Sequence, residues 1–204
     1  MNRREVLAAG GASLLLIAAG QPGAAAGQGR QRLVIDTLCL ATPDLDFAAM
    51  RGAGMDAALC DLPVYPRAPA EAEQALRAWG DASAAANRSF DLVRRHSDLA
   101  AAKGAGRFGI ILGSQDAAIL GTPVYSVSDE NLERLRQFHG LGLRVLQLTH
   151  NERNGVGDGF RERVDGGLSL LGEAVVAEMN NIGMLIDLSH CSDATTSGAI
   201  TRSS

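Results

Sequence analysis

Short β-branched runs alternate with alanine-rich amphipathic stretches along most of this 204-residue chain, and this alternation restricts the possible folds more than any other feature. Five apolar runs predict strands, at 32–36 (RLVID), 55–61 (MDAALCD), 107–112 (RFGIIL), 144–149 (RVLQLT) and 184–189 (MLIDLS). Apolar residues at helical spacing predict helices between them, over 45–51, 70–103 (one or two long helices), 129–141, 171–181 and 192–200. Apolar strands separated by helices favour a parallel sheet covered by helices, which is an α/β fold.

A β/α barrel and an open, doubly wound sheet both fit this pattern. No G-x-G-x-x-G or Walker-type glycine loop follows the first predicted strand, so the usual sequence support for a nucleotide-binding sheet is missing. Polar residues instead gather around the predicted strand ends: Asp36, Thr37, Asp61, Gln115, Asp116, His150, Asn151 and His190. In a barrel, all these positions lie on the catalytic face.

The first 26 residues have the pattern of an export signal. Arg3 and Arg4 precede an uncharged stretch over 6–20, and Ala24 and Ala26 satisfy the A-x-A cleavage rule. Paired arginines before a weakly apolar, glycine-interrupted stretch resemble a twin-arginine signal, which predicts a periplasmic location. The alternative is an uncleaved membrane anchor, but a membrane span needs about 20 strongly apolar residues. We therefore expect a signal peptide at 1–26 and one domain over 27–204.

Charge and cysteine content narrow the possible partners. The net charge is −4 and no cluster of Lys and Arg occurs, so we expect no nucleic-acid partner. The cysteines, Cys39, Cys60 and Cys191, form no C-x-x-C pair and therefore suit neither a disulfide framework nor a zinc ribbon. A single lysine, Lys103, leaves little room for Schiff-base or phosphate-loop chemistry.

The segments GLRVLQLTHNERN, at 142–154, and GLSLLGEAVVAEMNNIGMLIDLSHCSDAT, at 167–195, resemble the membrane dipeptidase family, also called renal dipeptidases. Members are export-targeted zinc metallopeptidases with a TIM-type β/α barrel related to metal-dependent hydrolases. The resemblance therefore implies that this chain holds about the first five strands of such a barrel. It also implies a hydrolase that cleaves dipeptides, in which a water held between two zinc ions attacks the peptide bond.

The resemblance assigns roles to three residues. The histidine that closes the D-L-S-H strand binds one zinc ion in the family, which implies a metal ligand at His190. The histidine of L-T-H-N contacts substrate and supports the tetrahedral intermediate, which implies a catalytic and substrate-binding role for His150, with Asn151 beside it in substrate binding. Without the resemblance, a hydrogen-bonded structural histidine and a turn asparagine are the alternatives for His190 and Asn151.

Three metal-ligand positions implied by the resemblance carry other residues here. The family has H-x-D after its first strand, whereas this chain has Leu38 and Leu40, and leucine does not bind zinc. A gapless placement puts Leu112 where the bridging glutamate stands, while Gln115 could occupy its space but is a poor anionic bridge. A further histidine ligand belongs to an S-H-S segment after the next strand, which we expect beyond residue 204.

These matches and departures leave two functions open. One is a periplasmic zinc metallodipeptidase. The other is a barrel relative that is non-catalytic or altered in activity and binds a small peptide or amino-acid-like ligand with one metal ion or none.

Five strands leave two open sheet edges, with apolar side chains partly uncovered at Ile35, Ile111, Leu146 and Ile186. We therefore expect the isolated chain to associate with copies of itself or to aggregate.

Overall fold

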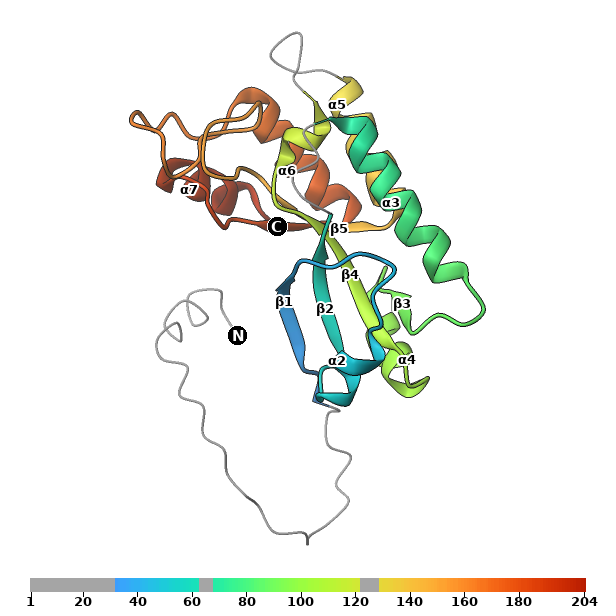
Figure 1. Ribbon diagram of the computed structural model, residues 1–204. Helices are drawn as coiled ribbons and strands as arrows, with labels where there is room; N and C mark the ends of the chain where they lie inside the picture. The colour runs from blue at the N-terminus through green and yellow to red at the C-terminus, as the bar shows by residue number, and fades with distance from the viewer. Residues whose placement is uncertain (1–31, 63–67, 122–128) are drawn as a thin grey trace, which may run out of the picture. The chain divides into compact units, whose positions relative to one another are not determined.

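The structure is a computed structural model that describes residues 32–62, 68–121 and 129–204 (Figure 1). The predicted signal peptide, 1–26, lies outside these residues. Among the helices of the described ranges, none is both long and apolar enough to cross a membrane.

The described strands form one sheet in which every strand pair is parallel. The strands are β1 (Ile35–Cys39), β2 (Ala57–Asp61), β3 (Phe90–Leu92), β4 (Phe108–Ser114), β5 (Leu143–Gln147) and β6 (Leu185–Asp187). Their order is β1-β2-β4-β5-β6, and β3 also pairs with β4. The predicted parallel α/β sheet is thus confirmed, and β1, β2, β4, β5 and β6 correspond to the five predicted strands.

Two sequence predictions within this sheet were wrong in detail. Strand β3 interrupts the helical stretch predicted over 70–103, because Phe90 and Leu92 pair with β4. A three-residue strand is too short to show an alternating pattern, so its pairing is decided by tertiary contacts. Strand β1 begins at Ile35 rather than at residue 32, which moves Asp36 from the end of the predicted strand to its second position.

The helices α3, α5, α6 and α7 pack beside one another in chain order (Figure 1). The helical elements are α2 (Ala48–Gly52), α3 (Pro69–Ala84), α4 (His96–Gly104), η2 (Ala117–Leu120), α5 (Asp129–Leu141), α6 (Leu170–Ile182) and α7 (Asp193–Arg202). Helix α6 begins where the Ser169 hydroxyl accepts the N–H of Gly172, at 3.0 Å, and it ends at Gly183, whose φ is 72°. Both ends are therefore encoded locally.

Side chains along the strands alternate between the helix-packed face and the inner face of the sheet. Leu146 is fully buried in the core, whereas its neighbour Val145 lines a hollow on the inner face. The expectation that Leu146 is partly uncovered is therefore wrong, and Ile186 is only partly buried but packs against the core. Ile35 and Ile111 are partly uncovered, as expected.

A partly buried ion pair holds the amino ends of the first two strands. One oxygen of Asp56 accepts hydrogen bonds from the Lys103 ammonium and the Val34 N–H, each at 2.9 Å. Burial alone would raise the pKa of Asp56, but the Lys103 and Val34 donors outweigh it and hold the pKa below its usual range. The single lysine of the chain thus joins α4 to the sheet.

Candidate functional site

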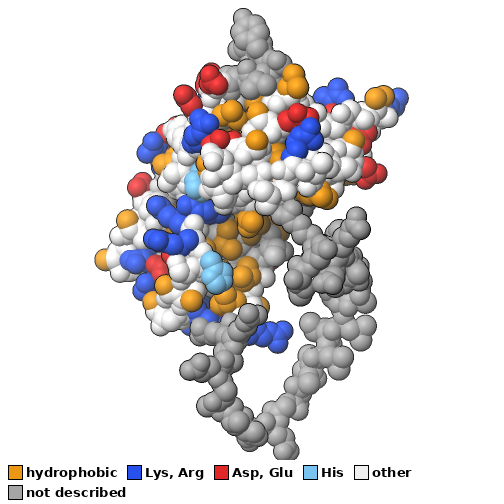
Figure 2. Space-filling model, turned by 180° about the vertical axis from the view of Figure 1, so that it is seen from behind, with side chains coloured by type: hydrophobic (Ala, Val, Ile, Leu, Met, Phe, Trp, Pro, Cys, Tyr) orange, Lys and Arg blue, Asp and Glu red, His pale blue; other side chains and the backbone are white. Residues whose placement is uncertain are grey.

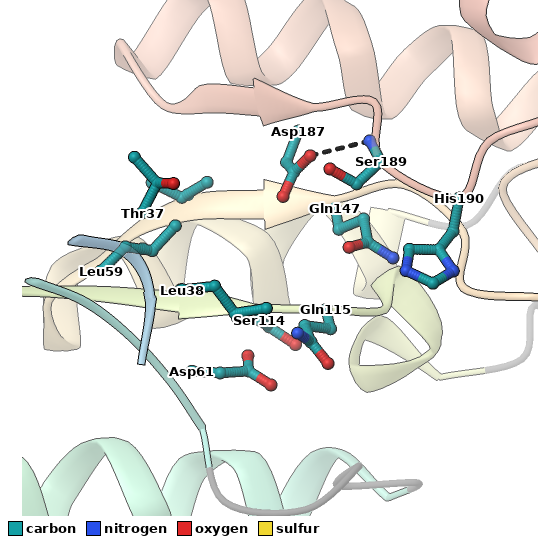
Figure 3. Close-up of a pocket in the computed structure, with 12 residues that line it drawn as sticks. Thr37, Leu38, Leu59, Asp61, Ser114, Gln115, Gln147, Asp187, Ser189 and His190 are labelled. Atoms are coloured by element: carbon teal, nitrogen blue, oxygen red, sulfur yellow. Dashed lines mark hydrogen bonds between the residues drawn. The ribbon is translucent and has the colours of Figure 1, made fainter. Parts of the chain in front are cut away.

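A hollow lies at the carboxyl ends of β1, β2, β4, β5 and β6 (Figure 3). Its volume is about 190 Å³, which suits a small polar ligand. The side chains that give the hollow its chemical character are Leu38, Asp61, Gln115, Gln147, Asp187 and His190. Because the strands are parallel, residues from five separate segments meet at one edge of the sheet. Of the polar residues expected on this face, Thr37, Asp61, Gln115 and His190 line the hollow, whereas Asp36 does not.

Two histidines stack at one end of this hollow. The rings of His150 and His190 have centroids 4.3 Å apart and are inclined by 17°. Asn151 lies with them, since its Oδ1 is 3.1 Å from Nδ1 of His190. All three residues to which the resemblance assigns roles are therefore neighbours, although His190 follows β6 and the other two follow β5.

Hydrogen bonds assign the proton positions on the two rings. The Gln147 amide nitrogen donates to the carbonyl of Thr149 at 2.6 Å, and it lies 3.4 Å from Nδ1 of His150. An amide N–H can only donate, so His150 accepts at Nδ1 and carries its proton on Nε2. The Asn151 oxygen can only accept, so His190 is protonated on Nδ1 and has its lone pair on Nε2. The paired rings thus offer one donor and one acceptor.

The backbone of His190 adopts a left-handed conformation that side-chain-bearing residues seldom occupy. Its φ is 63°, and it is the one non-glycine residue with positive φ in the described part of the chain. The N–H of Phe160 donates to the His190 carbonyl at 2.9 Å, and Gly159 forms a bridge to Cys191. The loop after β5 therefore holds His190 in this conformation, as is common for strained residues at functional sites.

The environment of His190 favours the neutral form of its ring. Burial is the largest influence, and together with the nearby His150 and Arg161 it lowers the pKa of His190, while Asp187 acts in the opposite direction. A neutral ring keeps the Nε2 lone pair that metal binding or hydrogen-bond acceptance requires.

Asp61 is the most buried carboxylate of the hollow. Its residue is 6% exposed, and its Oδ1 has no hydrogen-bond partner among the described residues. Burial raises the pKa of Asp61 to about 6, and the charge of Asp187 adds to this, while the backbone N–H groups of Gln115 and Leu62 oppose it. Desolvating a charged oxygen without a partner is costly, which marks Asp61 as an unusual group.

The residues of the hollow do not fit the two-zinc centre that the resemblance implies. Leu38 lines the hollow and is 54% exposed, while Leu40 is 74% exposed, and neither can bind a metal ion. The gapless placement of the bridging position on Leu112 is corrected, because Leu112 is buried in the core and Gln115 lines the hollow instead. Over the described ranges, no group of three or more His, Cys, Asp or Glu side chains is arranged to hold a metal ion.

Comparison with known families decides which proteins this chain is related to. The family model described as Membrane dipeptidase (Peptidase family M19) matches residues 40–204. The chain belongs to the membrane dipeptidase family. Membrane dipeptidases are metallopeptidases, so the family itself implies a metal ion, although the described residues depart from its ligand set.

Individual relatives agree with this assignment. The dipeptidase aclJ of Aspergillus oryzae is 52% identical over 63 residues, which are 30% of this chain and 15% of that protein. A crystal structure of an amidohydrolase from Pseudomonas aeruginosa is 31% identical with a TM-score of 0.71, covering 84% of this chain and 50% of that one. This chain therefore spans about half the length of that structure.

A more distant solved structure shares the fold alone. The metallo peptidase from Rhodobacter sphaeroides, liganded with a phosphinate mimic of the dipeptide L-Ala-D-Ala, is 19% identical with a TM-score of 0.62. The match covers 84% of this chain and 62% of that one. The described parallel sheet with its helices accordingly matches part of the TIM-type β/α barrel expected from the resemblance.

Sequence reasoning missed two features of the site. Gln147, which is 2% exposed and supports His150, stands inside the apolar run RVLQLT. A glutamine within a buried strand was the available signal, because a buried amide must have hydrogen-bond partners. The burial of Asp61 had no comparable signal, since it depends on side chains from other strands.

Proposed function

We propose that this protein hydrolyses dipeptides and that the hollow at the strand ends is part of its active site. The observation that carries the proposal is the stacked pair of His150 and His190 with Asn151, held at the carboxyl ends of parallel strands. Family membership supports the same chemistry. The phosphinate mimic of L-Ala-D-Ala in the Rhodobacter sphaeroides relative supports a dipeptide as the substrate class.

The chain's own residues supply binding and charge stabilisation in this proposal. With its proton on Nε2, His150 can donate a hydrogen bond to the oxygen of the scissile carbonyl as negative charge develops there. Asn151 holds the ring of His190 and keeps the Nε2 lone pair of that ring available. A two-ion zinc centre does not fit Leu38, Leu40 and Gln115.

A second candidate function is a relative that binds a small peptide or amino-acid-like ligand without cleaving it, with one zinc ion or none. The two leucines that replace metal ligands after the first strand favour this alternative. Metal analysis and a dipeptide hydrolysis assay on the purified full-length protein, grown with added zinc, separate the two candidates. Bound metal together with cleavage of L-Ala-D-Ala supports the hydrolase. Binding of L-Ala-D-Ala without cleavage supports the binding protein.

Replacing His150 tests its role in the hydrolase. We expect His150→Ala to lower turnover of L-Ala-D-Ala by roughly 100-fold or more, because removing one oxyanion donor has an effect of that order. His96→Ala changes an exposed histidine at the start of α4 and is the matched control, with turnover as in the wild type. Equal turnover in both variants would remove His150 from the mechanism.

We also propose that residues 1–26 are a cleaved twin-arginine signal and that the protein is periplasmic. The support is the paired Arg3 and Arg4 and the A-x-A site. In a bacterial host with twin-arginine export, the double variant Arg3→Lys and Arg4→Lys should keep the chain in the cytoplasm at its uncleaved mass. The wild type should reach the periplasm shortened by 26 residues. Wild-type protein that keeps its full mass and is found in the cytoplasmic membrane would instead support an uncleaved membrane anchor.

A further inference from the structure

The carboxylate of Asp61 is placed to receive a cationic group from outside the described residues. It closes β2, faces the hollow, and is 94% buried, since only 6% of the residue is exposed. Its Oδ1 has no hydrogen-bond partner in the described ranges. A buried oxygen of this kind gains more from a charged donor than from any other ligand group.

The charges of the hollow favour the same kind of ligand. Two carboxylates line it, Asp61 and Asp187, while none of its described lining residues is Lys or Arg. Asp187 already accepts a hydrogen bond from the N–H of Ser189, at 2.8 Å, through its Oδ1 (Figure 3). The described lining therefore contains acidic but no basic side chains other than His190, and Asp61 is the more buried of its two carboxylates.

Apolar neighbours strengthen an ion pair at this position. Leu38 and Leu59 line the hollow together with Asp61 (Figure 3). Side chains without dipoles lower the local dielectric constant, so a cation that reaches the carboxylate is attracted more strongly than in water. An ammonium group is compact and has three donors, and the amide oxygen of Gln115 offers a second acceptor in the same hollow.

We propose that Asp61 binds the α-ammonium group of the dipeptide and is a specificity-determining residue of this site. The inference rests on the proposed function, because it takes the ligand to be a dipeptide. With its amino end at Asp61, a dipeptide extends through the hollow toward His190, which lines the same space and stacks on His150. The site then selects ligands with a free amino terminus over ligands in which that terminus is acylated.

The test compares L-Ala-D-Ala with N-acetyl-L-Ala-D-Ala, which lacks the positive charge. Binding of each to the full-length protein is measured by calorimetry, and cleavage is followed in parallel. The wild type should bind the free dipeptide at least roughly tenfold more tightly, since that ratio corresponds to about 1.4 kcal/mol, within the range of a charged hydrogen bond. Asp61→Asn should abolish this preference while leaving affinity for the acetylated dipeptide unchanged.

A matched control removes the same charge elsewhere. Asp81→Asn changes an exposed carboxylate on α3, outside the lining of the hollow, and should keep the wild-type preference. Retained binding of the acetylated dipeptide by Asp61→Asn shows that the hollow is intact in that variant.

The outcomes separate this inference from the proposed function. Preference for the free amine without cleavage would support the role of Asp61 and overturn the hydrolase. If the wild type cleaves both dipeptides and binds them with equal affinity, and Asp61→Asn does the same, the hydrolase is supported and the role of Asp61 is overturned. Binding of neither dipeptide by the wild type would overturn both.

Discussion

At the scale of single residues, the site depends on groups held in costly states by their neighbours. His190 keeps a left-handed backbone because the loop after β5 bonds to its carbonyl. The carboxyl group of Asp61 lies where burial makes its ionisation unfavourable. Costs of this kind are typical of functional sites, where chemistry and stability conflict.

The raised pKa of Asp61 predicts an unusual dependence of stability on pH. The folded state holds the Asp61 proton up to about pH 6, whereas an unfolded chain releases it near its ordinary pKa of about 4. The contribution of Asp61 to stability therefore falls as the pH rises from about 4 through about 6. The difference of about two pKa units between the folded and unfolded states corresponds to a loss of at most about 3 kcal/mol in the free energy of unfolding.

Asp61→Asn removes this ionisation, so the full-length variant should be more stable than the wild type by roughly 1–3 kcal/mol at pH 7 and nearly equal to it at pH 4. Urea denaturation at both pH values measures the difference. The exposed Asp81→Asn should leave the wild-type difference between the two pH values unchanged. Parallel pH dependence in Asp61→Asn and the wild type would contradict the assignment of this titration to Asp61.

At the scale of elements, the loop between β5 and α6 positions the histidines, and its packing is tight. The carboxylate of Asp158, itself 3% exposed, pairs with Arg153 and accepts the N–H of Gly166 at 2.6 Å. The amide of Asn154 donates to Asp116 at 2.6 Å and thereby ties this loop to the one after β4. These bonds restrain an irregular segment, and such restraint is needed to position site residues.

Gly159 is the position in this loop where a side chain is least tolerable. A Cβ atom there would lie 2.4 Å from the carbonyl oxygen of Asn151 and 2.5 Å from its carbonyl carbon, both backbone atoms that cannot rotate away. Gly159→Ala should therefore destabilise the protein by about 1–3 kcal/mol and displace Asn151 from His190. Urea denaturation measures the stability, and turnover of L-Ala-D-Ala reports the displacement.

A glycine in open surroundings supplies the control for this change. Gly80 lies within α3, and a Cβ atom there would meet nothing within 4 Å. Gly80→Ala should stabilise the protein by about 0.5–1 kcal/mol, since alanine favours helix more than glycine does. If the two substitutions had the same effect, the close approach at Gly159 would not be limiting.

At the scale of the whole molecule, the described part of the sheet has unpaired strand edges and uncovered apolar side chains. In the described part of the chain, β1 and β6 are the ends of the strand order. Leu38 is 54% exposed and Leu185, on β6, is 66% exposed. The face seen from behind carries interspersed acidic and basic side chains with apolar side chains exposed between them (Figure 2). Unpaired edge strands such as β1 and β6 favour strand pairing between copies of the chain.

The isolated chain, expressed as residues 27–204, should therefore form oligomers or aggregate. Leu185→Lys places a charge on the edge strand β6 and should reduce association, because charged edge residues oppose strand pairing. The exposed substitution Ser97→Lys adds the same charge on α4 and should leave association unchanged. Light scattering measures the mass of each species. A monomeric wild-type chain with a sharp thermal transition would show that these edges are adequately protected.

Local pattern in the sequence was sufficient for the sheet type, for most helices and for the family. Strand runs and helical repeats are properties of neighbouring residues, and so are caps such as Ser169, so they can be recognised without a structure. The segments around His150 and His190 carried the family resemblance for the same reason. Strand β3 was not predicted, because three residues are too few to show an alternating pattern.

Tertiary structure alone decided which side chains meet and how they are solvated. Leu112 and Gln115 were alternative positions for the bridging ligand in the sequence, and in the fold Leu112 lies in the core while Gln115 lines the hollow. The stacking of His150 on His190 and the desolvation of Asp61 depend on segments brought together by parallel pairing. The sequence by itself determined which elements form and to which family they belong, since those properties are local. The partners and protonation of the site residues came from the fold, because electrostatics and burial depend on neighbours in space.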